Sequence, residues 1–126
     1  MHHVILYAIP QCDTVKKARL WLSERGISYQ FYDYKRQSFP ADRWDVWTQR
    51  IGRDRLINRQ GTTWRKLAAS DQDKALASDE AALELALAQP SVIKRPVVEW
   101  SNASGLHVSV GFTPELWERW HLETGD

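Results

Sequence analysis

Apolar residues open the chain in one unbroken run, residues 4–9, which ends at Pro10. A continuous apolar run with several β-branched members is typical of a strand that is buried on both faces. Further along, apolar positions recur at helical spacing among charged ones, at Val15, Ala18, Trp21 and Leu22. The pattern therefore predicts a strand, a short loop and an amphipathic helix, in that order.

The residues after this helix predict a second strand. Gly26 is a natural helix end, and residues 28–34 are rich in aromatic side chains and alternate in character. Strand, helix and strand indicate a βαβ unit with parallel strands and a right-handed crossover. In such a unit the loop at residues 10–12 lies at the carboxyl end of the first strand, where open α/β sheets bind their ligands.

The middle of the chain, residues 38–89, contains no convincing strand. Prolines near helix starts, glycines past helix ends and hydroxyl residues at N-cap positions predict helices here, with Ser78 as one such cap. The expected helices cover residues 40–51, 63–69 and 79–88, and residues 53–61 are expected to be irregular.

The remaining residues predict a hairpin followed by a helix. Residues 97–100 and 106–110 favour two antiparallel strands around a turn at 101–105. Thr113 followed by Pro114 is typical of a helix start. The element order is thus βαβ, then helices, then ββα.

This order describes an α/β protein with a thioredoxin-like fold, in which a mixed four-stranded sheet carries an inserted helical subdomain. A chain of 126 residues, 43% hydrophobic and 26% charged, matches one globular domain. We therefore expect a single domain, with its thioredoxin-like core at about 1–36 and 92–126 and the helical insertion at about 38–90.

Composition narrows the class of protein further. No apolar stretch is long enough to span a bilayer and the N-terminus lacks a secretory pattern, so we expect a cytoplasmic protein. A single cysteine excludes an internal disulfide and means that any redox cycle takes its second sulfur from another molecule. The histidines have no partners at metal-ligand spacing, so we predict no metal. Nothing in the sequence demands more than a monomer.

Charge is distributed unevenly along the chain. Residues 1–70 hold 13 Lys/Arg against 6 Asp/Glu, whereas residues 71–126 hold 4 against 10. Tryptophans interleave with the arginines after Arg43, a pattern that nucleic-acid-binding surfaces also show. Because Trp44, Trp47 and Ile51 follow helical spacing, we interpret them as a core stripe with the arginines on the solvent face, and expect no nucleic-acid partner.

The only cysteine, Cys12, lies where the first strand passes into the helix. Unpaired N–H groups in a first helical turn and the positive end of the helix dipole lower the pKa of a thiol below its free value of about 8.5. Lys16 and Lys17 add positive charge nearby, whereas Asp13 opposes them. We interpret Cys12 as a nucleophile; the alternative is a small buried hydrophobe, the common fate of a free cysteine.

Three blocks of sequence carry a resemblance to a known family. They read CDTVKKA at residues 12–18, NRQGTTWRKL at residues 58–67 and IKRP at residues 93–96. In this order they resemble the arsenate reductase/Spx family, and most closely its YffB-like branch of glutathione-dependent thiol reductases. The resemblance covers essentially the whole chain and implies a thioredoxin fold with an inserted helical subdomain.

The resemblance also implies roles for individual residues. Cys12 matches the nucleophilic cysteine, and Arg59 and Arg95 resemble two active-site arginines. A guanidinium offers a planar fork of donors to an oxyanion or carboxylate and favours a nearby thiolate, although a surface ion pair is the ordinary alternative. Pro96 matches a proline that thioredoxin-like folds hold in cis. We expect the substrate or glutathione to contact Gln11, Thr14, Lys16, Lys94 and Pro96.

Two positions depart from the family pattern. Members that sense oxidation carry a second cysteine where this chain has Val15, so an internal disulfide switch cannot form here. Members that reduce arsenate carry a third arginine in the stretch that reads SVGF at residues 109–112. Because three positive charges stabilise an arsenic–sulfur intermediate better than two, this loss predicts weak or absent arsenate reduction.

Two classes of function follow. The first is a thiol oxidoreductase in which Cys12 attacks a disulfide or another oxidised group and is released by glutathione or a glutaredoxin-like protein, with no permanently bound cofactor. The alternative is a non-enzymatic regulator of the Spx kind that associates with RNA polymerase. The absence of a second cysteine argues against a redox-switched regulator and favours the enzyme.

Overall fold

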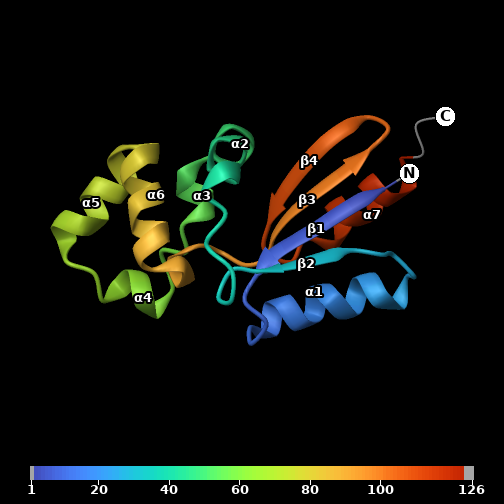
Figure 1. Cartoon of the computed structure of the whole chain (residues 1–126), viewed down its shortest axis with the longest axis horizontal. Helices are drawn as coiled ribbons and strands as arrows, with labels where there is room; N and C mark the ends of the chain where they lie inside the picture. Colours follow the sequence, from blue (N-terminus) through green and yellow to red (C-terminus); the bar gives the residue numbers. More distant parts are fainter. Residues whose placement is uncertain (1, 124–126) are drawn as a thin grey trace. The chain divides into compact units, whose positions relative to one another are not determined.

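The computed structural model describes residues 2–123, so the outermost residues of the expected core, 1 and 124–126, lie outside the described part. The chain divides into two compact units (Figure 1). Unit 1 comprises Met1–Gln37 and Arg95–Asp126, and unit 2 comprises Ser38–Lys94.

Unit 1 is built on a mixed four-stranded sheet in the order β2-β1-β3-β4. Strand β1 pairs in parallel with β2 and antiparallel with β3, which in turn pairs antiparallel with β4. The mixed four-stranded sheet predicted from the sequence is therefore confirmed. The elements of unit 1 are β1 (His3–Ala8), α1 (Asp13–Glu24), β2 (Gln30–Asp33), β3 (Val97–Asn102), β4 (Gly105–Val110) and α7 (Pro114–Leu122).

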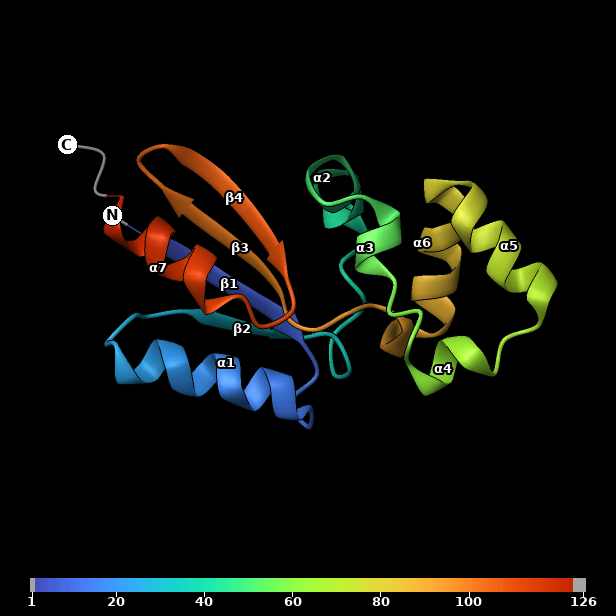
Figure 2. The same cartoon turned by 180° about the vertical axis from the view of Figure 1, so that it is seen from behind.

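Both helices of unit 1 pack on the same face of the sheet, and Figure 2 shows α7 in front of β1 and β3. Successive side chains of a strand point to opposite faces, so alternate residues of β1 and β3 supply this core. Helix α1 adds an i, i+3, i+4 stripe, and α7 adds two tryptophans. The buried cluster comprises Val4, Leu6, Ala18, Trp21, Leu22, Ile27, Val98, Trp100, Trp117 and Trp120.

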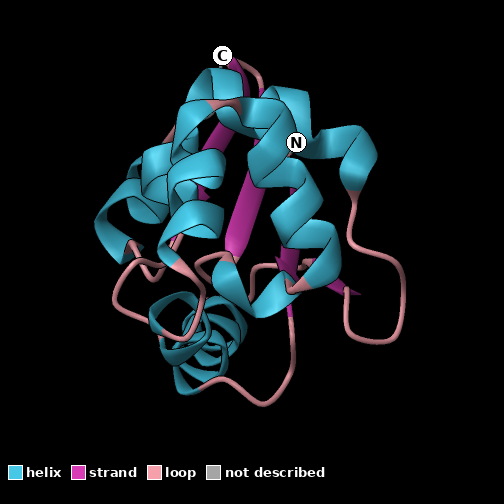
Figure 3. Cartoon of the chain, turned by 90° about the vertical axis from the view of Figure 1, so that its left-hand side faces the viewer, coloured by secondary structure: helices cyan, strands magenta, loops and turns pink. Residues whose placement is uncertain are grey.

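Unit 2 is helical throughout most of its length (Figure 3). Trp44 and Trp47 are 1% and 0% exposed, which confirms these two members of the predicted core stripe, whereas Ile51 is only half-buried. The Ser78 hydroxyl accepts a hydrogen bond from the backbone N–H of Ala81 at 3.1 Å, so Ser78 is the N-cap that the sequence predicted. The elements are η1 (Ala41–Arg43), α2 (Trp44–Arg50), α3 (Arg53–Leu56), α4 (Thr62–Arg65), α5 (Ala69–Ala77), α6 (Asp79–Ala88) and η2 (Pro90–Val92).

Three expectations for unit 2 were wrong or incomplete. The helix expected at residues 63–69 covers only Thr62–Arg65, and the next helix begins at Ala69. Residues 53–61 are not wholly irregular, because α3 forms a single helical turn after Gly52, whose φ of +93° suits glycine. Helix α5 was not predicted because Ala75 is its one buried residue, which leaves no apolar stripe to recognise. None of the described helices is long and apolar enough to cross a membrane.

Candidate active site

Cys12 occupies the N-cap position of α1. Its backbone is extended, with φ −113° and ψ 129°, and its carbonyl accepts the first helical hydrogen bond from the N–H of Lys16 at 3.0 Å. The N–H groups of the first turn have no partner within the helix, so they are available to the Cys12 sulfur. The side chain is half-buried, which leaves it accessible to another molecule.

Opposing effects act on the Cys12 thiol, and their sum lowers its pKa below that of an ordinary thiol. Burial alone raises the pKa. Hydrogen bonds from the backbone N–H of Val15, from the Arg95 guanidinium and from the N–H of Thr14, together with the positive charge of Arg95, outweigh it. The site therefore favours a thiolate, as its place at the helix start predicts. The contribution expected from Lys16 is not among these causes.

Arg95 reaches Cys12 from the start of β3. The peptide bond between Arg95 and Pro96 is cis, as the family resemblance implies. Val97, the next residue, pairs with Tyr7 near the carboxyl end of β1, and the Pro96 carbonyl accepts a hydrogen bond from the N–H of Gly111 at 2.9 Å. Arg95 is thus held at the edge of the sheet from which the Cys12 loop leaves.

Tyr34 is a member of the site that the sequence analysis missed. It directly follows β2, and its N–H donates to the carbonyl of Ala8, the last residue of β1, at 3.1 Å. Its side chain is only 3% exposed. Burial raises the pKa of Tyr34 to about 12, aided by the charge of Cys12 and opposed by the charge and hydrogen bonding of Arg95. The sequence could have indicated Tyr34, because it directly follows the second strand of the βαβ unit, and open α/β sheets bind ligands at the carboxyl ends of their strands.

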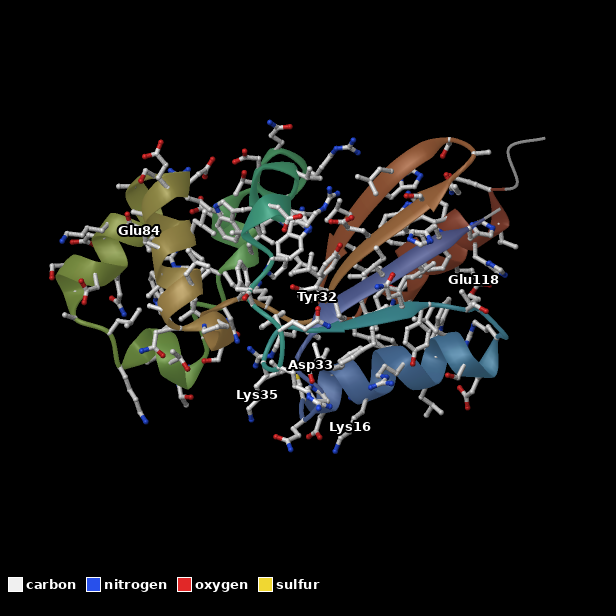
Figure 4. The ribbon with its side chains drawn as sticks, in the orientation of Figure 1. Lys16, Tyr32, Asp33, Lys35, Glu84 and Glu118 are labelled. Atoms are coloured by element: carbon white, nitrogen blue, oxygen red, sulfur yellow. The ribbon has the colours of Figure 1, made fainter. Side chains whose placement is uncertain are left out.

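The remaining residues of unit 1 that the sequence predicted for the site are close to Cys12 in the sequence. Thr14 supplies a backbone N–H to the Cys12 sulfur, and Gln11 and Lys16, which are near Cys12 in the sequence, are exposed. Figure 4 shows Lys16 at the start of α1 and Asp33 and Lys35 at the end of β2, all at the same end of unit 1. The Asp33 carboxylate accepts a hydrogen bond from the N–H of Lys35 at 3.0 Å and so shapes the loop after β2.

Arg59 and Lys94 belong to unit 2, where both side chains are exposed. Arg59 lies in a turn closed by a hydrogen bond from the Gly61 N–H to the Asn58 carbonyl at 3.2 Å. The Lys94 N–H donates to the Leu56 carbonyl at 2.8 Å, next to the isolated bridge between residues 57 and 93. The structure thus brings Cys12, Thr14 and Arg95 together, while Arg59 and Lys94 lie on adjacent segments of the other unit.

The stretch in which arsenate-reducing members carry a third arginine has a structural role here. Ser109 is 2% exposed, and its hydroxyl accepts a hydrogen bond from the Trp117 indole N–H at 2.9 Å. Phe112 packs against the same core, with its ring 5.5 Å from that of Trp117. Residues 109–112 are therefore neutral and engaged in packing. Across residues 2–123, no three His, Cys, Asp or Glu side chains are grouped as metal ligands.

Comparison with known proteins places this geometry in a family. Residues 7–120 match the model of the ArsC family. The chain is similar to the solved structure of a YffB protein, with 41% identity over 92% of this chain and 96% of the other, and a TM-score of 0.80. It is equally similar in sequence, at 41% identity over 95% of each chain, to an arsenate reductase (ArsC) related protein from Brucella melitensis, with a TM-score of 0.67.

Among curated proteins, the chain is similar to an uncharacterised protein of Haemophilus influenzae. The two are 34% identical over 95 residues, which is 75% of this chain and 82% of the relative. The structural matches agree with the thioredoxin-like fold predicted from the sequence.

Proposed function

Because the chain belongs to the ArsC family, we propose that it is a thiol reductase in which Cys12 is the nucleophile and glutathione the co-substrate. The observation that carries this proposal is the lowered pKa of Cys12 beside Arg95. A thiolate is the reactive form of cysteine, and it is available here at a lower pH than in an ordinary thiol.

The cycle requires two exchanges at sulfur. The Cys12 thiolate attacks one sulfur of a disulfide R–S–S–R′, which forms Cys12–S–S–R and releases R′–S⁻ as the S–S bond breaks. A glutathione thiolate then attacks the sulfur of R, which restores the Cys12 thiolate and forms glutathione–S–S–R. Because Cys12 is the only cysteine, the second thiol is supplied from outside, by glutathione or a glutaredoxin-like protein.

The residues around Cys12 fit this chemistry. The negative charge that develops in thiol exchange stays on sulfur, and Arg95 with the first-turn N–H groups already stabilises a charged Cys12 sulfur. Arg59 and Lys94 are cations that suit the glutathione carboxylates. Residues 109–112 offer no third guanidinium for the oxygens of arsenate, so we assign the site to sulfur substrates.

Incubation with a mixed disulfide of glutathione and a small thiol tests the proposal. We expect one glutathione or small-thiol adduct per chain, located at Cys12 by mass spectrometry and removed by added glutathione. Cys12→Ser is the blank. An intact, folded protein that forms no adduct at a pH where free glutathione exchanges readily would disprove the assignment.

A further inference from the structure

Four cationic side chains lie at the end of unit 1 that carries Cys12. Lys16 and Lys17 follow Cys12 by one turn of α1, and Lys35 and Arg36 belong to the loop after β2. All four side chains are exposed, and together they form the cationic surface. In the described part of the chain, none of their charged groups makes an ion pair or a hydrogen bond.

The sheet places the two segments of this surface at one edge. Strands β1 and β2 run parallel with Ala8 opposite Asp33, so their carboxyl ends coincide. The N–H of Tyr34 donates to the Ala8 carbonyl at 3.1 Å, which joins the loop after β2 to the strand that leads to Cys12. Figure 4 accordingly shows Lys16 and Lys35 at the same end of unit 1.

The loop after β2 has a backbone that is held by Asp33. The Asp33 carboxylate accepts hydrogen bonds from the N–H groups of Lys35 at 3.0 Å and Arg36 at 3.4 Å. The Asp33 carbonyl accepts another from the N–H of Gln37 at 2.9 Å. The carboxylate is therefore engaged with the backbone, and the charges of Lys35 and Arg36 are left to face solvent.

Other arginines of unit 1 have partners within the protein. Arg19 Nε donates to the Tyr29 hydroxyl at 3.0 Å, and the Arg25 guanidinium lies 4.0 Å from the centroid of the Trp21 ring. The cationic surface differs from them, because its two segments, residues 10–17 and 33–37, hold four Lys/Arg against two Asp and its cations have no such contacts. Unpaired charge of one sign attracts a partner of the opposite sign.

We infer that the cationic surface binds an acidic polypeptide whose disulfide sulfur then meets Cys12. Charge of one sign beside a reactive group raises the local concentration of oppositely charged partners and speeds their encounter. A nucleic acid or an oxyanion has no sulfur for Cys12 to attack, whereas a polypeptide carries carboxylates and a cysteine together. This inference deepens the proposed function and rests on the reaction of Cys12 with disulfides.

Three synthetic peptides of equal length test the inference. Each has one cysteine in a mixed disulfide with thionitrobenzoate, and the cysteine is flanked by glutamates, by lysines or by serines. The Cys12 thiolate attacks the peptide sulfur, forms Cys12–S–S–peptide and releases coloured thionitrobenzoate as the S–S bond breaks. Each rate is divided by the rate of the same peptide with 2-mercaptoethanol, which corrects for the reactivity of the peptide itself.

At low salt, we expect the glutamate peptide to react about tenfold faster than the lysine peptide, with the serine peptide between them. The ratio of the glutamate rate to the lysine rate should approach one in about 1 M salt, where screening acts within roughly 3 Å. Equal rates at low salt, or a ratio that does not respond to salt, would overturn the inference.

Charge reversal tests whether this surface is responsible. Lys17→Glu and Lys35→Glu, one on each segment, should each lower the ratio at low salt by roughly two- to threefold. Arg119→Glu is the matched control, because Arg119 is exposed and follows Glu118, which Figure 4 shows at the other end of unit 1. It should leave the ratio unchanged. An equal fall in all three variants would show that overall net charge sets the ratio, and would overturn the inference.

A fourth substrate, the mixed disulfide of glutathione and thionitrobenzoate, separates a polypeptide partner from a small anion. We expect Lys17→Glu and Lys35→Glu to slow its reaction less than that of the glutamate peptide, since glutathione carries fewer carboxylates. An equal slowing would overturn the inference. If Cys12 reacts with none of the four substrates, the proposed function fails and this inference fails with it, whereas equal peptide rates overturn this inference alone.

Discussion

The two arginines that the sequence proposed for the active site differ in how the fold supports them. Arg95 is half-buried at the start of β3, bonded to a cis proline, and acts on Cys12. Arg59 is exposed in a four-residue turn of unit 2. A guanidinium held by a sheet is preorganised for charge stabilisation, whereas one on a turn is suited to meeting a bound molecule. The comparison shows that Arg95 acts on the Cys12 thiol within unit 1, whereas Arg59 is an exposed side chain of unit 2.

The largest expected effect concerns the packing of the core of unit 1. Trp117 is 0% exposed, and its indole N–H donates to Ser109. We expect Trp117→Ala to lower the free energy of unfolding by about 3–5 kcal/mol in urea titrations, because it leaves a cavity and an unpartnered hydroxyl. Leu87→Ala, at a half-exposed position of α6 in unit 2, should change it by less than about 0.5 kcal/mol. Similar losses of unfolding free energy in Trp117→Ala and Leu87→Ala would show that the core of unit 1 is no more sensitive than the surface of unit 2.

Arsenate tests how much charge unit 1 supplies. Because residues 109–112 are neutral and engaged in packing, we expect arsenate turnover to be slower by roughly 10²–10³ than in a protein with a third guanidinium, the usual worth of one preorganised donor. Purified protein is assayed with arsenate, glutathione and glutaredoxin, with Cys12→Ser as the blank. Rapid Cys12-dependent arsenite production would instead make the protein an arsenate reductase.

Exchange of each arginine for alanine tests the division of roles directly. Either Arg95→Ala or Arg59→Ala should weaken glutathione binding by about 1–3 kcal/mol, measured by calorimetry. Only Arg95→Ala should also move the alkylation profile of Cys12 to higher pH, because the groups that lower the pKa of Cys12 all belong to unit 1. If the affinity for glutathione is unchanged in both variants, neither arginine contributes to glutathione binding.

The lowered pKa of Cys12 also predicts a pH dependence of stability. The pKa of Cys12 is lower in the folded chain than in the unfolded chain. Such a group stabilises the folded protein at pH values above its unfolded pKa, and this stabilisation is lost as the pH falls through its folded pKa. Relative to Cys12→Ser, the protein should therefore gain free energy of unfolding as the pH rises toward about 9. Urea titrations of both proteins over this range measure the difference. A gap that narrows with pH would contradict the lowered pKa.

The smallest effect belongs to a surface ion pair of unit 2. Arg53 and Asp79 are 2.8 Å apart, with side chains 30% and 49% exposed. Because solvent and salt screen such a pair, Asp79→Asn should cost less than about 1 kcal/mol of unfolding free energy, and less still at high salt. A larger, salt-independent loss would show that this charge has a structural role beyond the pair.

Local pattern alone identified the elements with strong periodicity. The sequence predicted the β1 strand, the apolar stripe of α1, the hairpin and the Ser78 cap, because hydrophobic spacing and capping chemistry act within a few residues. Helix α5 and the turn of α3 were not, since few of their side chains are buried. Tertiary contacts stabilise such short helices, and those contacts leave little trace in the local sequence.

The sequence by itself indicated the candidate nucleophile, because the only cysteine lies at the start of a helix whose N–H groups act on it directly. Only the tertiary structure decided which groups surround it. Tyr34 and Arg95 are remote from Cys12 along the chain, and they reach it because β2 and β3 pair with β1 in one register. Pairing between strands is a long-range property, so the composition of each segment could not reveal that a buried tyrosine and this arginine would share the site.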